Sequence, residues 1–158
     1  MKNVVRTEIN SMLKENMIPK ELLSEVGIHQ WENIIQKFEQ AFIKKSHYTN
    51  QISWYWLFLK SDGYSVHFID DDAYKHLHKL VDENERIFFM VEEKSAKPKF
   101  WVYEGNITMI QKIIDETFAF EYYIFSKKFE WLLCENHHGI LIGFGDKIIE
   151  KMKLCLLN

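Results

Sequence analysis

The first 45 residues carry apolar side chains at helical spacing. One stripe at i, i+4, i+7 and i+8 predicts a one-faced amphipathic helix formed by Val5, Ile9, Met12 and Leu13. A later stripe predicts a second such helix through Trp31, Ile34, Ile35, Phe38 and Phe42. Between the two, Pro19 suits the first turn of a short helix and Gly27 suits its end. The pattern therefore predicts a helical N-terminal part over residues 1–45.

From residue 50 onward, the pattern changes to that of strands. Residues 54–59 are apolar at every position, which indicates an interior strand covered on both faces. The pair Asp62-Gly63 is a hairpin turn signal. Apolar and polar side chains then alternate over residues 64–68, as expected of a partner strand. We therefore expect a hairpin here, with the strands on either side of Asp62-Gly63.

Further strands and helices alternate along the rest of the chain. Strands are predicted at residues 87–91, 100–103, 122–125 and 129–134, with 140–142 as a hairpin partner of the last. Helices are predicted at residues 73–81, 107–118 and 146–154. Since the strands come as hairpins and not as repeated β-α-β units, a doubly wound parallel sheet is not expected. The predicted fold is α+β, with N-terminal helices followed by a largely antiparallel sheet of about six strands and helices packed on it.

Length and composition support one domain over residues 1–158, helical over 1–45 and with sheet and helices over 50–158. The chain is 47% hydrophobic, enough for a core that needs neither disulfides nor a structural metal. Cys134 and Cys155 lie in apolar patterns and are expected to be buried. No signal-peptide pattern or apolar run of about 18 residues occurs, so we expect a cytoplasmic protein without a membrane span.

Charge is nearly balanced overall but uneven along the chain. The formal net charge of −3 gives no general reason to bind nucleic acid or anionic lipid. Residues 70–93, however, hold eight acidic and three basic side chains, a local net charge of −5. These carboxylates could simply cap a helix and face water, or they could dock a basic protein partner and speed its encounter. The residues expected to bind such a partner are Asp70, Asp71, Asp72, Asp82, Glu83 and Glu85.

The segment Glu135-Asn136-His137-His138-Gly139 carries the clearest candidate chemistry. If the strand continues to His138, Glu135 and His137 share one face, and a carboxylate beside an imidazole can serve as an acid–base pair. The two imidazoles would then point apart and could not hold one metal ion, so no metal site is expected. Alternatively, the segment is a hairpin turn whose imidazoles bond to the chain.

Other motifs add no chemistry. The chain has no P-loop and no G-x-G-x-x-G motif, so no cofactor is expected. His76 and His78 lie two apart on a predicted helix and do not face one direction. A nucleophilic pair of Cys134 with His137 would need a thiol that strand pairing buries. The rings at residues 54–56 could stack bases, but core packing is the expected role.

Two C-terminal motifs are distinctive, namely Glu121-Tyr122-Tyr123 and the segment from Trp131 to Gly139, which reads W-L-L-C-E-N-H-H-G. They resemble motifs of a family of small uncharacterised bacterial proteins. The piece Trp101-x-Tyr103-Glu104-Gly105 is similar too, and the resemblance spans about residues 50–145. It implies no activity and no catalytic residue. Small acidic α+β proteins of this kind are often immunity partners in bacterial toxin systems.

We therefore expect a non-enzymatic protein-binding module, of the immunity or antitoxin kind, that masks a basic toxin surface with its acidic segment. The alternative is a hydrolase or nuclease that uses Glu135 with His137 or His138. A self-assembling structural protein is a third hypothesis, and the oligomeric state stays open.

Overall fold

A computed structural model of the chain describes residues 4–44, 55–68, 72–93, 100–117 and 120–156. Its α-helices are α1 (Val4–Glu15), α2 (Ile28–Phe42), α3 (Ile107–Glu116) and α4 (Asp146–Cys155). Two short 3-10 helices are η2 (Tyr55–Leu57) and η3 (Ala73–Lys79). The strands are β1 (Leu23–Glu25), β2 (Tyr64–His67), β3 (Ile87–Glu92), β4 (Phe100–Gly105), β5 (Tyr122–Ser126), β6 (Leu132–Glu135) and β7 (Ile140–Phe144). None of the described helices combines the length and apolar character needed to cross a membrane.

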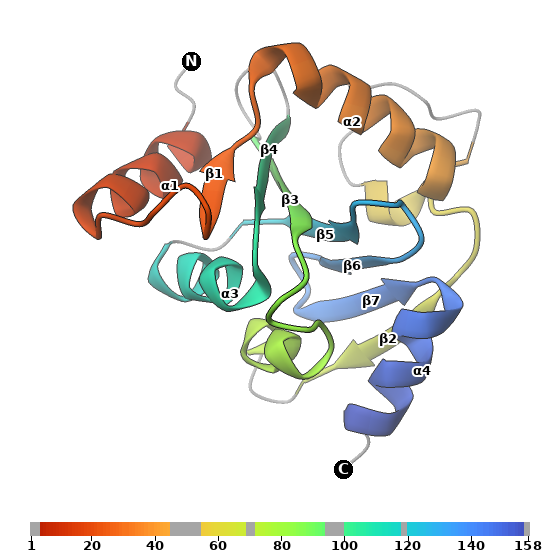
Figure 1. Cartoon of the computed structure of the whole chain (residues 1–158). Helices are drawn as coiled ribbons and strands as arrows, with labels where there is room; N and C mark the ends of the chain where they lie inside the picture. Colours follow the sequence, from red (N-terminus) through yellow and green to blue (C-terminus); the bar gives the residue numbers. More distant parts are fainter. Residues whose placement is uncertain (1–3, 45–54, 69–71, 94–99, 118–119, 157–158) are drawn as a thin grey trace.

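The described strands form one sheet in the order β1-β4-β3-β5-β6-β7-β2, and every neighbouring pair is antiparallel. Figure 1 shows β1 and β2 at the two opposite edges. The predicted α+β class and antiparallel sheet are confirmed, with seven described strands where about six were expected. The central strands β3 and β5 are buried along their whole length, because helices cover both faces of the sheet.

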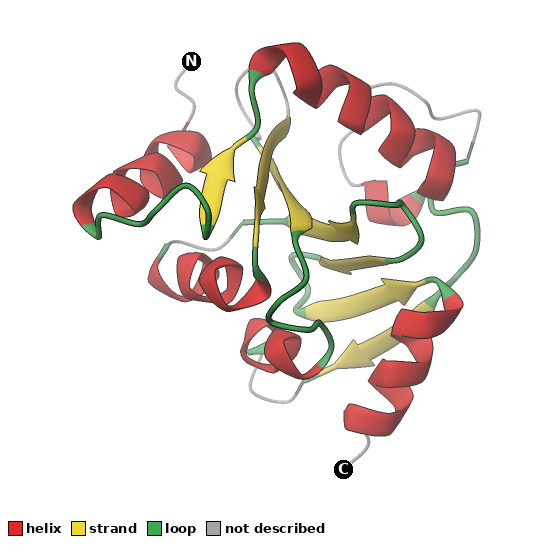
Figure 2. Ribbon diagram, viewed as in Figure 1, coloured by secondary structure: helices red, strands yellow, loops and turns green. Residues whose placement is uncertain are grey.

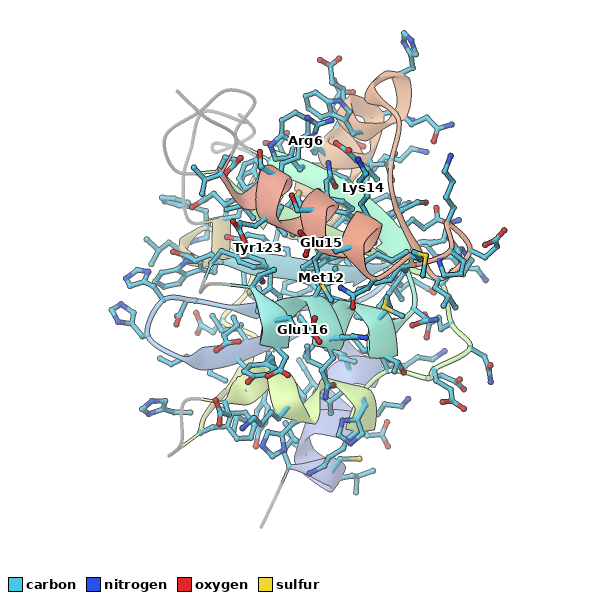
Figure 3. The ribbon with its side chains drawn as sticks, turned by 90° about the vertical axis from the view of Figure 1, so that its left-hand side faces the viewer. Arg6, Met12, Lys14, Glu15, Glu116 and Tyr123 are labelled. Atoms are coloured by element: carbon cyan, nitrogen blue, oxygen red, sulfur yellow. The ribbon has the colours of Figure 1, made fainter. Side chains whose placement is uncertain are left out.

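Helices lie on both faces of the sheet (Figure 2), and each face carries its own core. On one face, apolar side chains of α1, η3, α3 and α4 pack against the sheet. Figure 3 looks onto this face, where α1 and α3 lie side by side. On the other face, α2 and η2 enclose a ring-rich core in which Phe38 contacts Phe42, Tyr55, Tyr123 and Phe125. The rings therefore serve mainly as packing.

Two predicted elements are wrong. The short helix expected between Pro19 and Gly27 is a turn followed by β1, which adds an edge strand beside β4. The strand expected at 54–59 is the 3-10 helix η2 in its described part, so there is no hairpin across Asp62-Gly63. Instead, β2 pairs with β7, far along the chain.

Three further local features have different outcomes. The Asn106 side chain accepts a hydrogen bond of 2.9 Å from the Met109 N–H and so caps α3. Asp72 holds the N-cap position of η3, but its side chain pairs with the Lys75 ammonium and does not cap the helix. Cys134 is buried as expected, whereas Cys155 is exposed, because it lies in the last turn of α4 away from the core.

Candidate functional site

The β6–β7 connection is a tight turn, as the alternative interpretation of this segment predicted. The strand ends at Glu135, and the Gly139 N–H donates to the Asn136 carbonyl at 3.0 Å. The Asn136 side chain accepts hydrogen bonds from the N–H groups of His138 and Ile140, at 2.9 and 3.2 Å. Gly139 has a φ of 72°, which favours glycine. The backbone that carries both histidines is thus held by Asn136.

Glu121 lies beneath this turn and is bonded through both carboxylate oxygens. Because Tyr122 pairs with Glu135 across β5 and β6, the preceding residue Glu121 meets the start of the turn. Its Oε1 lies 2.9 Å from Nδ1 of His137, and its Oε2 accepts a 2.6 Å hydrogen bond from Nε1 of Trp56. Glu121 is only 2% exposed, while the His137 side chain is 38% exposed. A buried carboxylate therefore orients an imidazole that reaches the surface.

The rings of Trp56, His137 and His138 contact one another above this carboxylate. The two imidazole centroids are 4.0 Å apart, and the Trp56 ring lies 5.8 and 6.2 Å from them. The rings come together because the histidines lie in a turn, where the alternation of a strand does not apply. We call Trp56, Glu121, His137 and His138 the turn cluster. Among the described residues, no group of three or more His, Cys, Asp or Glu could hold a metal ion.

Glu135 was the carboxylate predicted to pair with the histidines. Its described hydrogen bond instead joins it to Tyr122. Its Oε1 accepts a 2.7 Å hydrogen bond from the Tyr122 hydroxyl, whose ring lies in the core beneath α1 and α3. Burial, together with Glu135, raises the pKa of Tyr122. The structure thus brings His137 and His138 together and gives His137 a different carboxylate.

Polar groups continue from the turn cluster into the ring-rich core. The Tyr55 hydroxyl donates to Glu39 at 2.6 Å, and burial raises the pKa of Glu39 despite this hydrogen bond. Tyr123 is fully buried, and burial, Cys134, Glu92 and Glu121 raise the pKa of its hydroxyl. Burial, assisted by Glu121, also raises the pKa of the Cys134 thiol. A thiol that stays protonated is a poor nucleophile, which argues against a Cys134–His137 pair.

The acidic segment is spread over several environments. Asp70 and Asp71 lie outside the described residues. Asp72 pairs with Lys75 at 2.7 Å, and Asp82 accepts a hydrogen bond from the Asn84 N–H at 2.8 Å. Asp82 and Glu83 are exposed and Glu85 is half-buried, all in the loop before β3. Glu92 and Glu93 are each 2% exposed, and Glu93 accepts the first N–H groups of α1.

The acidic loop 82–85 and the turn cluster lie at opposite ends of the central strands. Ile87, at the start of β3, pairs with Ser126, whereas Val91, near its end, pairs with Tyr122 beside Glu121. The acidic loop therefore cannot form one continuous surface with the histidines.

Neither Glu121 nor Trp56 was expected from the sequence to lie at a site with the histidines. Glu121 had a usable signal, because a hairpin that turns at 126–129 places Tyr122 opposite Glu135 and Glu121 next to the turn. Trp56 had none, since its segment reads as a strand and its contact with Glu121 joins distant parts of the chain.

The comparisons with known proteins give one match. No curated protein and no solved structure matched the chain. Residues 1–155 match the model of a family of unknown function, DUF6756, which covers nearly the entire sequence. The chain therefore belongs to the DUF6756 family.

Proposed function

We propose that this protein is a protein-binding module of the immunity or antitoxin kind and that the turn cluster is the centre of its binding surface. The observation that carries the proposal is the group of mutually touching, solvent-reaching rings of Trp56, His137 and His138. Trp is among the residue types that dominate the binding energy of protein interfaces.

Preorganisation of these rings supports the proposal. Glu121 fixes the Trp56 and His137 side chains, and Asn136 fixes the backbone of the turn. Side chains held before binding lose little conformational entropy when a partner arrives. Leu57, next to Trp56 in η2, is 50% exposed.

A basic partner suits this site for two physical reasons. A guanidinium or ammonium group is attracted to the face of an indole ring. It would also be attracted to the half-buried Glu135 carboxylate at the end of the sheet. The acidic loop 82–85 lies at the opposite end of the central strands and is not part of this surface.

The test is capture of the partner from host cells with the tagged full chain, followed by measurement of affinity with the purified partner. Trp56→Ala is expected to bind about thirtyfold more weakly, equivalent to about 2 kcal/mol, as for an interface hot spot. Lys37→Ala, exposed on α2, is the control and should bind normally. A partner that binds Trp56→Ala as tightly as the wild type would refute the proposed surface.

A second candidate function, acid–base hydrolysis, is favoured by the 2.9 Å contact between Glu121 and His137. A carboxylate bonded to Nδ1 fixes the ring tautomer and leaves proton exchange to Nε2. The chain is expected to cleave phosphodiester or ester substrates on this hypothesis. His137→Gln and Glu121→Gln should each lose about a hundredfold or more in rate, while His78→Gln, exposed on η3, should not. Equal rates in all three variants would rule out this chemistry.

A further inference from the structure

The two edge strands of the sheet differ in how they are protected from pairing with a further strand (Figure 1). At one edge, Glu25 of β1 forms an ion pair of 2.7 Å with Arg6 of α1. A charged side chain that is tied to a neighbouring helix discourages a further strand from pairing there. At the other edge, β2 contains no charged residue and no proline. Among the described residues, β7 is the one strand that pairs with β2.

The apolar side chains of the β2 edge are only partly covered by the rest of the molecule. Tyr64 and Val66 of β2, and Phe68 directly after it, pack against the core beneath α3 and α4 but remain half-buried. Leu141, which lies opposite Val66 on β7, is fully buried. Because side chains of adjacent strands cover one another, a further strand beside β2 would bury more of these three side chains.

The segment from Tyr64 to Phe68 has the same kinds of residue in both directions from its centre, Val66. A polar residue lies on either side of Val66, and an aromatic residue follows in each direction. In an antiparallel pair of identical strands about a twofold axis, residues equally far from the axis on the two copies lie opposite each other. An axis at Val66 would therefore set Tyr64 opposite Phe68 of the second copy, and Ser65 opposite its His67.

Each of these cross-strand pairs is chemically compatible. Aromatic side chains directly opposite each other stabilise an antiparallel pair, and so do β-branched side chains such as Val66 facing its own copy. Both kinds of pair lie on the face of the core, whereas Ser65 and His67 are exposed on the other face. This symmetric pattern favours a copy of the same strand over a strand of another protein, which would not require the symmetry.

We infer that β2 pairs with β2 of a second copy of this chain, antiparallel and centred on Val66, so that the two sheets join into one. This interface does not rest on the function proposed for the turn cluster.

The test is sedimentation velocity of the full chain over a concentration range of about 5 to 200 µM, in which the wild type is expected to pass from monomer to dimer. The variant Ser65→Lys/His67→Lys would place like charges opposite each other twice across the axis. It is expected to dimerise about tenfold or more weakly than the wild type.

The matched variant is Ser65→Lys/His67→Glu, which changes the same two exposed positions. In the pairing centred on Val66, each introduced ammonium would face a carboxylate of the second copy. This variant is therefore expected to dimerise within about threefold of the wild type, or more tightly. Circular dichroism and urea unfolding of both variants distinguish a change at the interface from a folding defect.

Three results would overturn the inference. A wild-type chain that stays monomeric at about 200 µM would leave the edge to a strand of another protein. Equal dimerisation of the wild type and of Ser65→Lys/His67→Lys would place the contact between copies elsewhere. Equal weakening in the two double variants would contradict the pairing centred on Val66.

Discussion

Three buried glutamates are each bonded to a donor from another segment of the chain. Glu121 accepts from Trp56 and His137, Glu93 from the first N–H groups of α1, and Glu39 from the Tyr55 hydroxyl. A carboxylate without such donors would be costly to bury. These contacts therefore hold α1, α2, η2 and the β6–β7 turn to the sheet in addition to apolar packing.

Glu39 makes the stability of the protein depend on pH. Because burial raises its pKa, the folded chain keeps this proton above the unfolded value of about 4.3. Between the two pKa values, the unfolded chain has released the proton and the folded chain has not, so stability falls as pH rises through the folded pKa. Glu39→Gln keeps a hydrogen-bond acceptor for the Tyr55 hydroxyl and removes the loss of stability that Glu39 causes as pH rises.

We expect the free energy of unfolding of Glu39→Gln, relative to the wild type, to increase from about pH 4 toward neutral pH. Urea denaturation at several pH values measures this difference. Glu32→Gln, exposed on the same helix, is the control and should follow the wild-type curve. Parallel curves for Glu39→Gln and the wild type would show that Glu39 does not titrate differently on folding.

The sequence identified the histidines of the turn cluster but not the carboxylate that orients them. Neighbours in sequence suggested Glu135, whereas the contact depends on the register of β5 against β6 and on the geometry of the turn. The register of two strands is set by backbone hydrogen bonds between distant segments. It cannot be deduced from the residue types along one segment.

At the scale of elements, amphipathic stripes were the dependable signal. The stripes of α1, α2 and α3 face a core in the structure, as helical spacing requires. The runs at 19–27 and 54–59 were misjudged for different reasons. Leu23 lies in β1 and not in a helix, because its side chain is buried where β1 pairs with β4. Tyr55 and Trp56 are held in a 3-10 turn by side-chain bonds to Glu39 and Glu121.

The pairing of β1 with β4 requires a glycine at position 105. A Cβ atom there would lie 2.3 Å from the Leu22 carbonyl oxygen and 2.8 Å from Leu23 Cα. These are backbone atoms that cannot move without breaking the strand pair. Gly105→Ala is therefore expected to destabilise the protein by about 1–3 kcal/mol. Urea or thermal unfolding measures the change.

Gly27→Ala is the matched control for this substitution. A Cβ atom at Gly27 meets nothing within 4 Å, and its φ of −61° suits any residue. Its stability is expected to stay within about 0.5 kcal/mol of the wild type. Similar losses in the two variants would contradict the steric explanation.

At the scale of the whole molecule, the two cores share the strands of a single sheet. Phe89 and Ile124 face one core, and Phe88 and Phe125 face the other, although each pair alternates along the same strands. Loss of either core would expose one face of β3 and β5. We therefore expect the two cores to unfold together, as in a single cooperative domain.

Phe38→Ala tests this coupling from the α2 side. It removes ring contacts with Phe42, Tyr55, Tyr123 and Phe125 and is expected to cost about 3–5 kcal/mol. Tryptophan fluorescence and far-ultraviolet circular dichroism should report the same midpoint in the variant and in the wild type. Leu154→Ala, 74% exposed on α4, is the control. Separate midpoints for the two signals would show that the faces unfold independently.

The order of the strands also bears on how the chain folds as it leaves the ribosome. β1 and β2 are made early but occupy the two edges, and their partners β4 and β7 follow much later. Until residues 140–144 emerge, Tyr64 and Val66 have no strand to pair with and their apolar side chains stay uncovered. Pairings of such long range slow folding and lengthen exposure to aggregation. The sheet is therefore expected to be completed only after residues 140–144 have been synthesised.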